Sequence, residues 1–414
     1  MPRYWVETLG CPKNQVDSDK LTGTLVADGY EAASSPDEAD VIVVNTCAFI
    51  EAARQESVDT ILGLADLKAD GARLVVTGCM AERYGDDLAQ ALPEADLVAG
   101  FGTPVTLGSK PSAPAMDLLN LSRPKSGRPW AYVKIAEGCD RSCGFCAIPS
   151  FRGPQRSRDV ASILGEVESL EAKEIVLVAQ DLASYGKDRP GELGAGSIVP
   201  LVRAVAERVP RVRLLYLYPS DLTEELIDVV GAESGVAYYD LSLQHVSKPL
   251  LRRMRRWGDG DRFLRRIGDI RERYPDAAFR SNFIVGYPGE TEADHDALLR
   301  FVEAAQLDWV GFFSYSEEEG TYAADLDGKV DAHLMQERLT ELKALQDDIT
   351  EARRRQLVGE TIEVLVDAPG EARSHREAPE IDGVVEVPES MPVGEFVKVT
   401  VTGAFGPDLS AVPV

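Results

Sequence analysis

The six cysteines of this chain lie shortly after apolar, β-branched runs that are typical of buried strands. Three of them follow such runs within three residues: Cys11 after residues 5–9, Cys47 after residues 41–44 and Cys79 after residues 74–77. Helical patterns separate the runs, and strands that are apolar throughout predict a parallel sheet covered by helices on both faces. Because such sheets collect ligands at their carboxyl edge, these three thiols, the dispersed triplet, are expected to meet in space. The repeated position favours a cluster held by three thiolates over cysteines that fill a core.

The other three cysteines, Cys139, Cys143 and Cys146, fall within eight residues and follow the strand-like run 132–135. We call them the compact triplet. Three thiolates can hold three irons of a 4Fe-4S cube and leave the fourth iron open to a small molecule. S-adenosylmethionine, which offers an amine and a carboxylate, is the obvious ligand for such an iron.

Zinc and disulfides are the alternatives for these thiols. A structural zinc site needs four ligands, usually in paired Cys-x-x-Cys hooks, and no second hook or suitably spaced histidine follows the compact triplet. A disulfide framework is disfavoured because 414 residues carry only six cysteines, and three crowded cysteines cannot pair without leaving one over. An iron-sulfur cluster is therefore the favoured interpretation.

Six further strand candidates follow, at residues 132–136, 174–179, 213–217, 239–243, 279–285 and 310–315. Helical patterns fill the gaps, and this alternation predicts a partial (βα)6 barrel, less closed than the eightfold one. Active sites of such barrels lie where the strands end, and the compact triplet follows the first strand. Further strand-end residues are expected to contact the cofactor or substrate, although some of them only shape turns. They are Gln180, Asp181, Gln244, Ser247, Gly286 and Pro288.

The chain divides into four segments, which together predict an α/β protein. Residues 1–105 form a Rossmann-like parallel-sheet domain, 106–129 a linker rich in Gly, Pro and Ser, 130–356 the barrel with a long exit helix, and 357–414 a small β-barrel. In the last segment, short strands at 361–366, 383–387 and 396–401 alternate with Gly and Pro turns. This pattern is typical of an antiparallel barrel.

The net charge is −25, and both ends of the chain are acidic. Residues 1–100 contain 18 acidic and 7 basic side chains, and residues 358–414 contain 11 and 3. Such a surface repels phosphate backbones and attracts basic partners, although solubility alone explains the charge equally well. No apolar run approaches the length of a membrane span, and the start lacks a basic region followed by an apolar stretch. We expect a cytoplasmic protein with no membrane partner, because reduced thiols and an oxygen-sensitive cluster suit that compartment.

The cysteine layout and three motifs resemble the radical S-adenosylmethionine methylthiotransferases over essentially the whole chain. The motifs are Thr8-Leu9-Gly10-Cys11-Pro12-Lys13-Asn14, Asn45-Thr46-Cys47-Ala48-Phe49-Ile50 and Val76-Thr77-Gly78-Cys79. The resemblance implies a cluster domain, a radical S-adenosylmethionine barrel and a TRAM barrel, in the order derived above. It also implies two 4Fe-4S clusters. The compact triplet, with Phe145 beside the cofactor, would hold the one that cleaves S-adenosylmethionine to a 5'-deoxyadenosyl radical, and the dispersed triplet an auxiliary cluster that carries or delivers sulfur.

Four further motifs, residues 146–154, 179–181, 215–219 and 315–321, resemble the RimO branch of this family. That branch methylthiolates the β-carbon of an aspartate in ribosomal protein S12, with a second S-adenosylmethionine as methyl donor, and the resemblance implies the same reaction here on free or ribosome-bound substrate. An external electron donor is also implied. The first alternative is the branch that methylthiolates isopentenyl-adenosine in transfer RNA. The acidic terminal barrel favours a basic protein over nucleic acid, because a barrel that grips RNA should be basic. The second alternative, a two-cluster electron-transfer protein, needs no six-stranded barrel.

Overall fold

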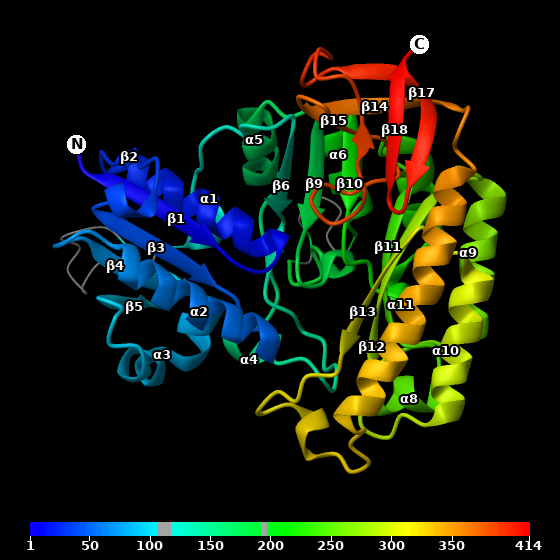
Figure 1. Cartoon of the computed structure of the whole chain (residues 1–414), viewed down its shortest axis with the longest axis horizontal. Coiled ribbons are helices and arrows are strands. Elements are labelled where there is room, and N and C mark those ends of the chain that lie inside the picture. Colours follow the sequence, from blue (N-terminus) through cyan, green and yellow to red (C-terminus); the bar gives the residue numbers. More distant parts are fainter. Residues whose placement is uncertain (106–116, 190, 192–196) are drawn as a thin grey trace.

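The computed structural model of the chain describes residues 1–105, 117–189, 191 and 197–414. Three units follow one another along the chain: an amino-terminal sheet with its helices, a central partial barrel and a small carboxyl-terminal β-barrel (Figure 1). Of the predicted linker, residues 106–116 lie outside the described residues. Its remainder contains a short 3-10 turn, η2 (Leu118–Asn120).

The amino-terminal unit is a five-stranded parallel sheet with strand order β2-β1-β3-β4-β5. Its strands are β1 (Arg3–Thr8), β2 (Glu31–Ala32), β3 (Val41–Thr46), β4 (Arg73–Gly78) and β5 (Leu97–Ala99). Its helices are α1 (Pro12–Ala27), α2 (Glu51–Leu67) and α3 (Cys79–Ala91). The central strand β3 is buried over its whole length, which explains its apolar sequence. The sequence pattern missed β2 and β5 because they are too short to show a period.

The central unit is the partial barrel that six alternating strands predict. Its strands are β6 (Trp130–Lys134), β9 (Glu174–Val178), β10 (Arg211–Leu214), β11 (Tyr238–Gln244), β12 (Ala278–Val285) and β13 (Trp309–Ser314). They form two parallel sheets, β10-β9-β6 and β11-β12-β13. A parallel bridge between Leu217 and Leu241 joins the sheets, so β6 and β13 remain as edges. A small antiparallel pair, β7 (Ala136–Glu137) with β8 (Arg156–Ser157), encloses the loop that carries the compact triplet.

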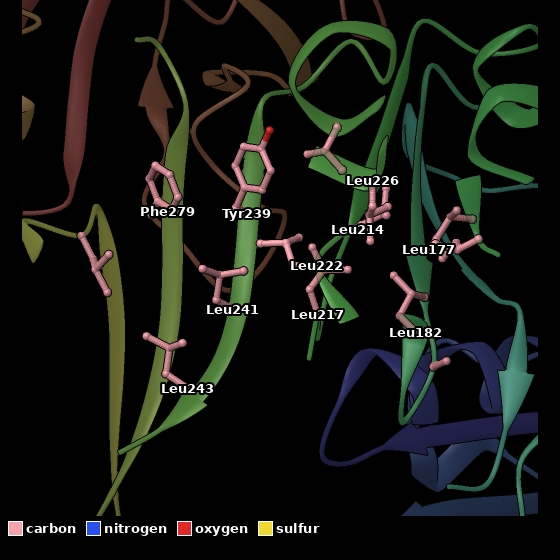
Figure 2. Packing of buried hydrophobic residues seen from close by; sticks show 14 of the residues in the cluster. Leu177, Leu182, Leu214, Leu217, Leu222, Leu226, Tyr239, Leu241, Leu243 and Phe279 are labelled. Atoms are coloured by element: carbon pink, nitrogen blue, oxygen red, sulfur yellow. The ribbon is translucent and has the colours of Figure 1, made fainter. Parts of the chain in front are cut away.

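Helices pack on the outer face of this barrel. They are α5 (Val160–Leu170), α6 (Val199–Ala206), α7 (Glu224–Asp228), α8 (Lys248–Arg253), α9 (Gly260–Arg273), α10 (Glu292–Ala305) and α11 (Ala332–Arg355), with the short α4 (Ile148–Arg152) beside the compact triplet. The core beneath them includes Leu177, Leu214, Leu217, Tyr239, Leu241 and Phe279 (Figure 2). Val176 and Tyr238, one residue before two of these, belong to a separate inner cluster, as the alternation of a strand requires. No helix in the described part of the chain is long and apolar enough to cross a membrane.

The carboxyl-terminal unit is a closed barrel with strand order β14-β15-β16-β18-β17. Its strands are β14 (Thr361–Ala368), β15 (Glu371–Arg373), β16 (Val385–Glu386), β17 (Phe396–Phe405) and β18 (Asp408–Pro413). The barrel is antiparallel as expected, except that β16 and β18 pair in parallel. The sequence pattern missed β15, which has three residues, and β18, which buries only Leu409 and Ala411.

The segment between β15 and β16 reaches into the central barrel. The Tyr132 hydroxyl donates to the Pro379 carbonyl at 2.9 Å, and Trp309 Nε1 donates to the Arg376 carbonyl at 2.7 Å. Ile381, from the same segment, lines the cavity described below. The small barrel therefore contributes to the inner wall of the central unit.

Buried ion pairs fix this insertion. Glu174, at the start of β9, contacts Arg213 at 2.8 Å and Arg373 of β15 at 3.2 Å, and Arg354 of α11 pairs with Glu377. Burial by itself would raise the pKa of both glutamates. The neighbouring arginines outweigh it and lower the pKa of Glu174 and of Glu377 to about 2.

We predict that acid loosens this junction. A carboxyl group whose pKa is lower in the folded state stabilises the fold above its unfolded pKa and loses that contribution as the pH falls through the folded pKa. For these two glutamates the window runs from 4.5 down to about 2. Urea unfolding across the window should show a free energy of unfolding that falls with pH, less steeply in Glu377→Gln than in the wild type. Equal slopes in the two proteins would contradict the assignment.

Candidate functional site

All six cysteines line one cavity of about 440 Å³ between the amino-terminal unit and the central barrel. Four more of the predicted site residues line it too: Phe145, Gln180, Asp181 and Gln244. The sequence predicted the dispersed and the compact triplet separately. The structure brings both to the same chamber.

The dispersed triplet is assembled at the carboxyl edge of the amino-terminal sheet. Cys11 precedes α1, Cys47 follows β3 and Cys79 opens α3. Gly10 has a φ of +94°, and a Cβ at this position would lie 2.8 Å from the Cβ of Cys47. Only glycine therefore allows the backbone beside Cys11 to approach Cys47 so closely. The amino termini of α1 and α3 place the positive ends of two helix dipoles beside their thiols.

Two cations act on these thiols. Arg152 Nη2 donates to Cys79 Sγ at 3.0 Å. Burial alone would raise the pKa of Cys11, but the charges of Lys13 and Arg152 outweigh it and lower that pKa below its usual value. Burial, with the Cys11 thiol nearby, raises the pKa of Cys47 to about 12. A thiol such as Cys47 becomes a thiolate when it binds metal, and the site then releases its proton.

The compact triplet lies in the loop between β7 and β8, beside α4. The backbone N–H of Arg141 donates to Cys139 Sγ at 3.4 Å, and Arg256 Nη1 donates to Cys143 Sγ at 3.4 Å. Burial raises the pKa of Cys139 to about 11 and that of Cys146 to about 12. These sulfurs thus combine burial with nearby N–H donors, and both features tune the reduction potential of an iron-sulfur cluster.

The two donor sets fit iron-sulfur cubes better than zinc. Among the described residues, which include every cysteine, no three Cys, His, Asp or Glu side chains lie close enough together to hold a single metal ion. A structural zinc ion requires four such converging ligands. Each thiolate of a cube binds its own iron, so a cube does not require its thiolates to converge on one point.

Gln180 Oε1 and Asp181 Oδ1 are buried acceptors on the cavity wall that have no hydrogen-bond partner in the described part of the chain. The opposite atoms of both side chains are fixed: Gln180 Nε2 donates to Glu137 at 2.6 Å, and Arg141 Nε donates to Asp181 at 2.5 Å. A buried acceptor without a donor is costly, so each is expected to accept a hydrogen bond from a bound ligand. The amine of S-adenosylmethionine is such a donor.

Two non-glycine residues with positive φ also line the cavity. Tyr216, which follows β10, has a φ of +66°, and Gln244, the last residue of β11, has a φ of +69°. Backbone of this kind is uncommon outside glycine and concentrates at functional sites. The strain supports the prediction that Gln244 belongs to the site.

Ser247, Gly286 and Pro288 do not line the cavity in the described part of the chain. The Ser247 hydroxyl donates to Asp294, at the start of α10. A Cβ on Gly286 would lie 2.1 Å from Met335 Sδ, so glycine there allows α11 to pack closely. Ser247 and Gly286 thus have local structural contacts, and a role in cofactor binding stays a prediction for all three residues.

Sequence reasoning missed the cations of the cavity wall. They are Lys13, Arg141, Arg152, Arg256 and Arg280. The first two stand two residues after a cysteine, which was an available signal. Arg256 belongs to an arginine-rich run that also fits a solvated helix face. Arg280 lies inside an apolar strand, where an arginine indicates a buried partner.

Three family profiles match this chain: Uncharacterized protein family UPF0004 over residues 3–100, Radical SAM superfamily over residues 133–302, and TRAM domain over residues 358–414. A curated relative from Moorella thermoacetica, named ribosomal protein uS12 methylthiotransferase RimO, is 44% identical over 97% of this chain and 97% of that protein. The chain belongs to the RimO family. RimO proteins from Nocardioides sp. and Kineococcus radiotolerans are each 41% identical, over 98% of this chain and 96% of the relative.

A solved structure with a similar fold is the radical S-adenosylmethionine methyltransferase TsrM from Kitasatospora setae, which has cobalamin and a 4Fe-4S cluster bound. Its TM-score is 0.50 at 14% identity, over 95% of this chain and 84% of that one. At this identity the likeness shows the fold alone. Membership of the RimO family confirms the predicted class: a radical S-adenosylmethionine methylthiotransferase that uses 4Fe-4S chemistry and S-adenosylmethionine.

Proposed function

We propose that this protein methylthiolates the β-carbon of an aspartate in ribosomal protein uS12, using two S-adenosylmethionine molecules and a sulfur donor. The observation that carries the proposal is that both cysteine triplets line one cavity. The β-carbon must lose a hydrogen atom and receive sulfur at the same place. Its C–H bond is too weakly acidic for a general base at neutral pH, so cofactor chemistry has to act there.

In this proposal the compact triplet holds the cluster that reacts with S-adenosylmethionine, and the dispersed triplet holds the auxiliary cluster. When bound, the cluster of the compact triplet would supply the electron that cleaves S-adenosylmethionine, and the auxiliary cluster would supply the site from which sulfur is delivered. The chain itself binds and orients the reactants. Gln180 Oε1 and Asp181 Oδ1 accept hydrogen bonds from S-adenosylmethionine, and the apolar walls at Phe145 and Phe151 exclude water from the reacting carbon.

A basic protein substrate fits the acidic carboxyl-terminal barrel. Of its three basic residues, Arg373 is only 1% exposed and pairs internally with Glu174 and Asp367. Asp367 and Glu377 are buried as well, and the exposed side chains of the barrel remain predominantly acidic. Such a surface attracts a basic ribosomal protein and repels the phosphates of transfer RNA.

Several finer points belong to the same proposal. The chain divides into residues 1–105 with the auxiliary cluster, a linker at 106–129, the barrel with its exit helix at 130–356, and a TRAM-like barrel at 357–414. The substrate is free or ribosome-bound uS12, and an external donor supplies electrons. A cytoplasmic location suits the reduced thiols and the oxygen-sensitive clusters.

Incubation with each candidate substrate tests the proposal. The reconstituted protein, with S-adenosylmethionine, a reductant and sulfide, is offered purified uS12 in one reaction and unmodified transfer RNA in another. We expect mass spectrometry to find one methylthio group in place of one hydrogen on uS12, and tandem spectra to place it on an aspartate. Modification of the transfer RNA alone would support the first alternative, and modification of neither would contradict the proposed function.

A further inference from the structure

Aspartate brings its own negative charge into the cavity. The carbon that receives sulfur is bonded directly to the side-chain carboxylate, so both enter the chamber together. A carboxylate removed from water needs a cation or several hydrogen-bond donors beside it. A cation of the cavity wall can bind this carboxylate only if it is not already held in an ion pair.

Three of the five wall cations already pair with carboxylates of the chain. Arg141 pairs with Asp181 and Asp221, Arg152 with Asp17 and Glu137, and Arg280 with Asp240 and Asp382. Recruiting any of them would weaken or remove the ion pairing of a carboxylate of the chain. These three arginines therefore stabilise the cavity wall through ion pairs within the chain.

A fourth cation, Arg256, belongs to the compact triplet. It donates to Cys143 Sγ at 3.4 Å and to the Ser242 carbonyl, and its guanidinium lies 4.0 Å from the centroid of the Tyr218 ring. These contacts place its charge on the side of the cavity where S-adenosylmethionine is expected.

Lys13, like Arg256, has no carboxylate at ion-pair distance within the described residues, but it lies beside the dispersed triplet, where its charge acts on the Cys11 thiol. Its Nζ is 3.5 Å from the centroid of the Tyr216 ring. Tyr216 is held in place by its strained backbone, φ +66°, and by an N–H bond to Asp240 at 2.9 Å. An ammonium group has three N–H donors, and an aromatic face attracts the cation without satisfying them all.

Lys13 also stands on the side from which sulfur is delivered in the proposed reaction. It lies in the first turn of α1, two residues after Cys11, and both residues line the cavity. Resting on the proposed function, we propose that Lys13 binds the side-chain carboxylate of the target aspartate and makes the cavity select aspartate, with Tyr216 positioning the ammonium group. The amino-terminal unit then supplies both the auxiliary cluster site and the substrate's counter-charge.

A double-mutant cycle between enzyme and substrate tests this inference. Binding of uS12, and of uS12 with its target aspartate changed to asparagine, is measured with the cluster-loaded full chain by fluorescence anisotropy. The wild type should bind the aspartate form about ten- to a hundredfold more tightly, as expected for a hydrogen bond between charged groups. Lys13→Met should bind both forms with the same affinity, Lys13→Arg should recover part of the preference, and Lys68→Met, outside the cavity in the same unit, should keep all of it.

The outcomes separate this inference from the proposed function. If the wild type methylthiolates uS12 and Lys13→Met still prefers aspartate by the wild-type factor, the role of Lys13 is wrong while the function stands. If the wild type does not modify uS12, the function itself fails. Iron content is measured for every variant, and Lys13→Gln replaces Lys13→Met in the cycle if the latter does not load both clusters.

Discussion

Replacing Cys143 by alanine is expected to reduce formation of 5'-deoxyadenosine to background. This thiol is one of three in the compact triplet, and its sulfur accepts a hydrogen bond from Arg256 at 3.4 Å. With two thiolates left, the site no longer holds three irons of a cube with one iron open, and reductive cleavage of S-adenosylmethionine has no electron source. Chromatographic measurement of 5'-deoxyadenosine after anaerobic reduction, with and without uS12, checks this result.

The matched variant in the other triplet should behave differently. Cys47→Ala removes a ligand of the auxiliary site and leaves the compact triplet intact, so 5'-deoxyadenosine should still form while uS12 gains no methylthio group. Because both cysteines line the same cavity, a difference between the two variants would reflect the different roles of the two triplets and not their locations. Formation of 5'-deoxyadenosine by Cys143→Ala would refute the assignment of the triplets.

Replacing Arg152 by methionine is expected to destabilise the protein strongly. This buried arginine donates to Glu137 at 2.9 Å, to Asp17 at 3.3 Å and to Asn14 at 2.8 Å, so it ties the central barrel to α1. Without it, two buried carboxylates keep only Lys134 as a cation among the residues that the structure describes. Breaking a buried network in this way costs about 3–5 kcal/mol.

Urea unfolding of the iron-free proteins measures that effect. Lys125→Met is the control, since Lys125 pairs with Glu171 on the surface, where both side chains are about two-thirds exposed, and exposed pairs contribute at most about 1 kcal/mol. Arg152→Met should also lose iron from the dispersed triplet, because Arg152 donates to Cys79 Sγ. A variant with wild-type stability and iron content would show that Arg152 is not needed at this junction.

Much of the fold was predictable because it depends on local patterns. Strand β3 is buried on both faces and begins with four apolar residues, and apolar residues also predominate in the barrel strands, although β12 and β13 are only partly buried. The strand-end rule then placed the cysteines at ligand-binding edges. The sequence pattern did not predict strands β2, β5 and β15, because two or three residues are too few to show an alternation of apolar and polar residues.

The shared cavity was not predictable from such patterns. It depends on how the amino-terminal unit docks on the barrel, and that docking is made by contacts between distant residues, such as Arg152 with Asn14, 138 positions apart. The same holds for the wall contributed by Ile381, because nothing in its local sequence indicates that the segment after β15 enters another unit. Lys13 was visible in the motif, but its lack of a carboxylate partner among the described residues is a property of the folded chain.

The central claim, that two triplets hold two clusters in one chamber, is tested most directly by counting iron. Anaerobically reconstituted wild type should contain about eight irons per chain, and changing all three cysteines of either triplet to alanine should leave about four. Electron paramagnetic resonance of the reduced proteins identifies which cluster remains. A wild type that holds only four irons, or zinc in either triplet, would contradict the account.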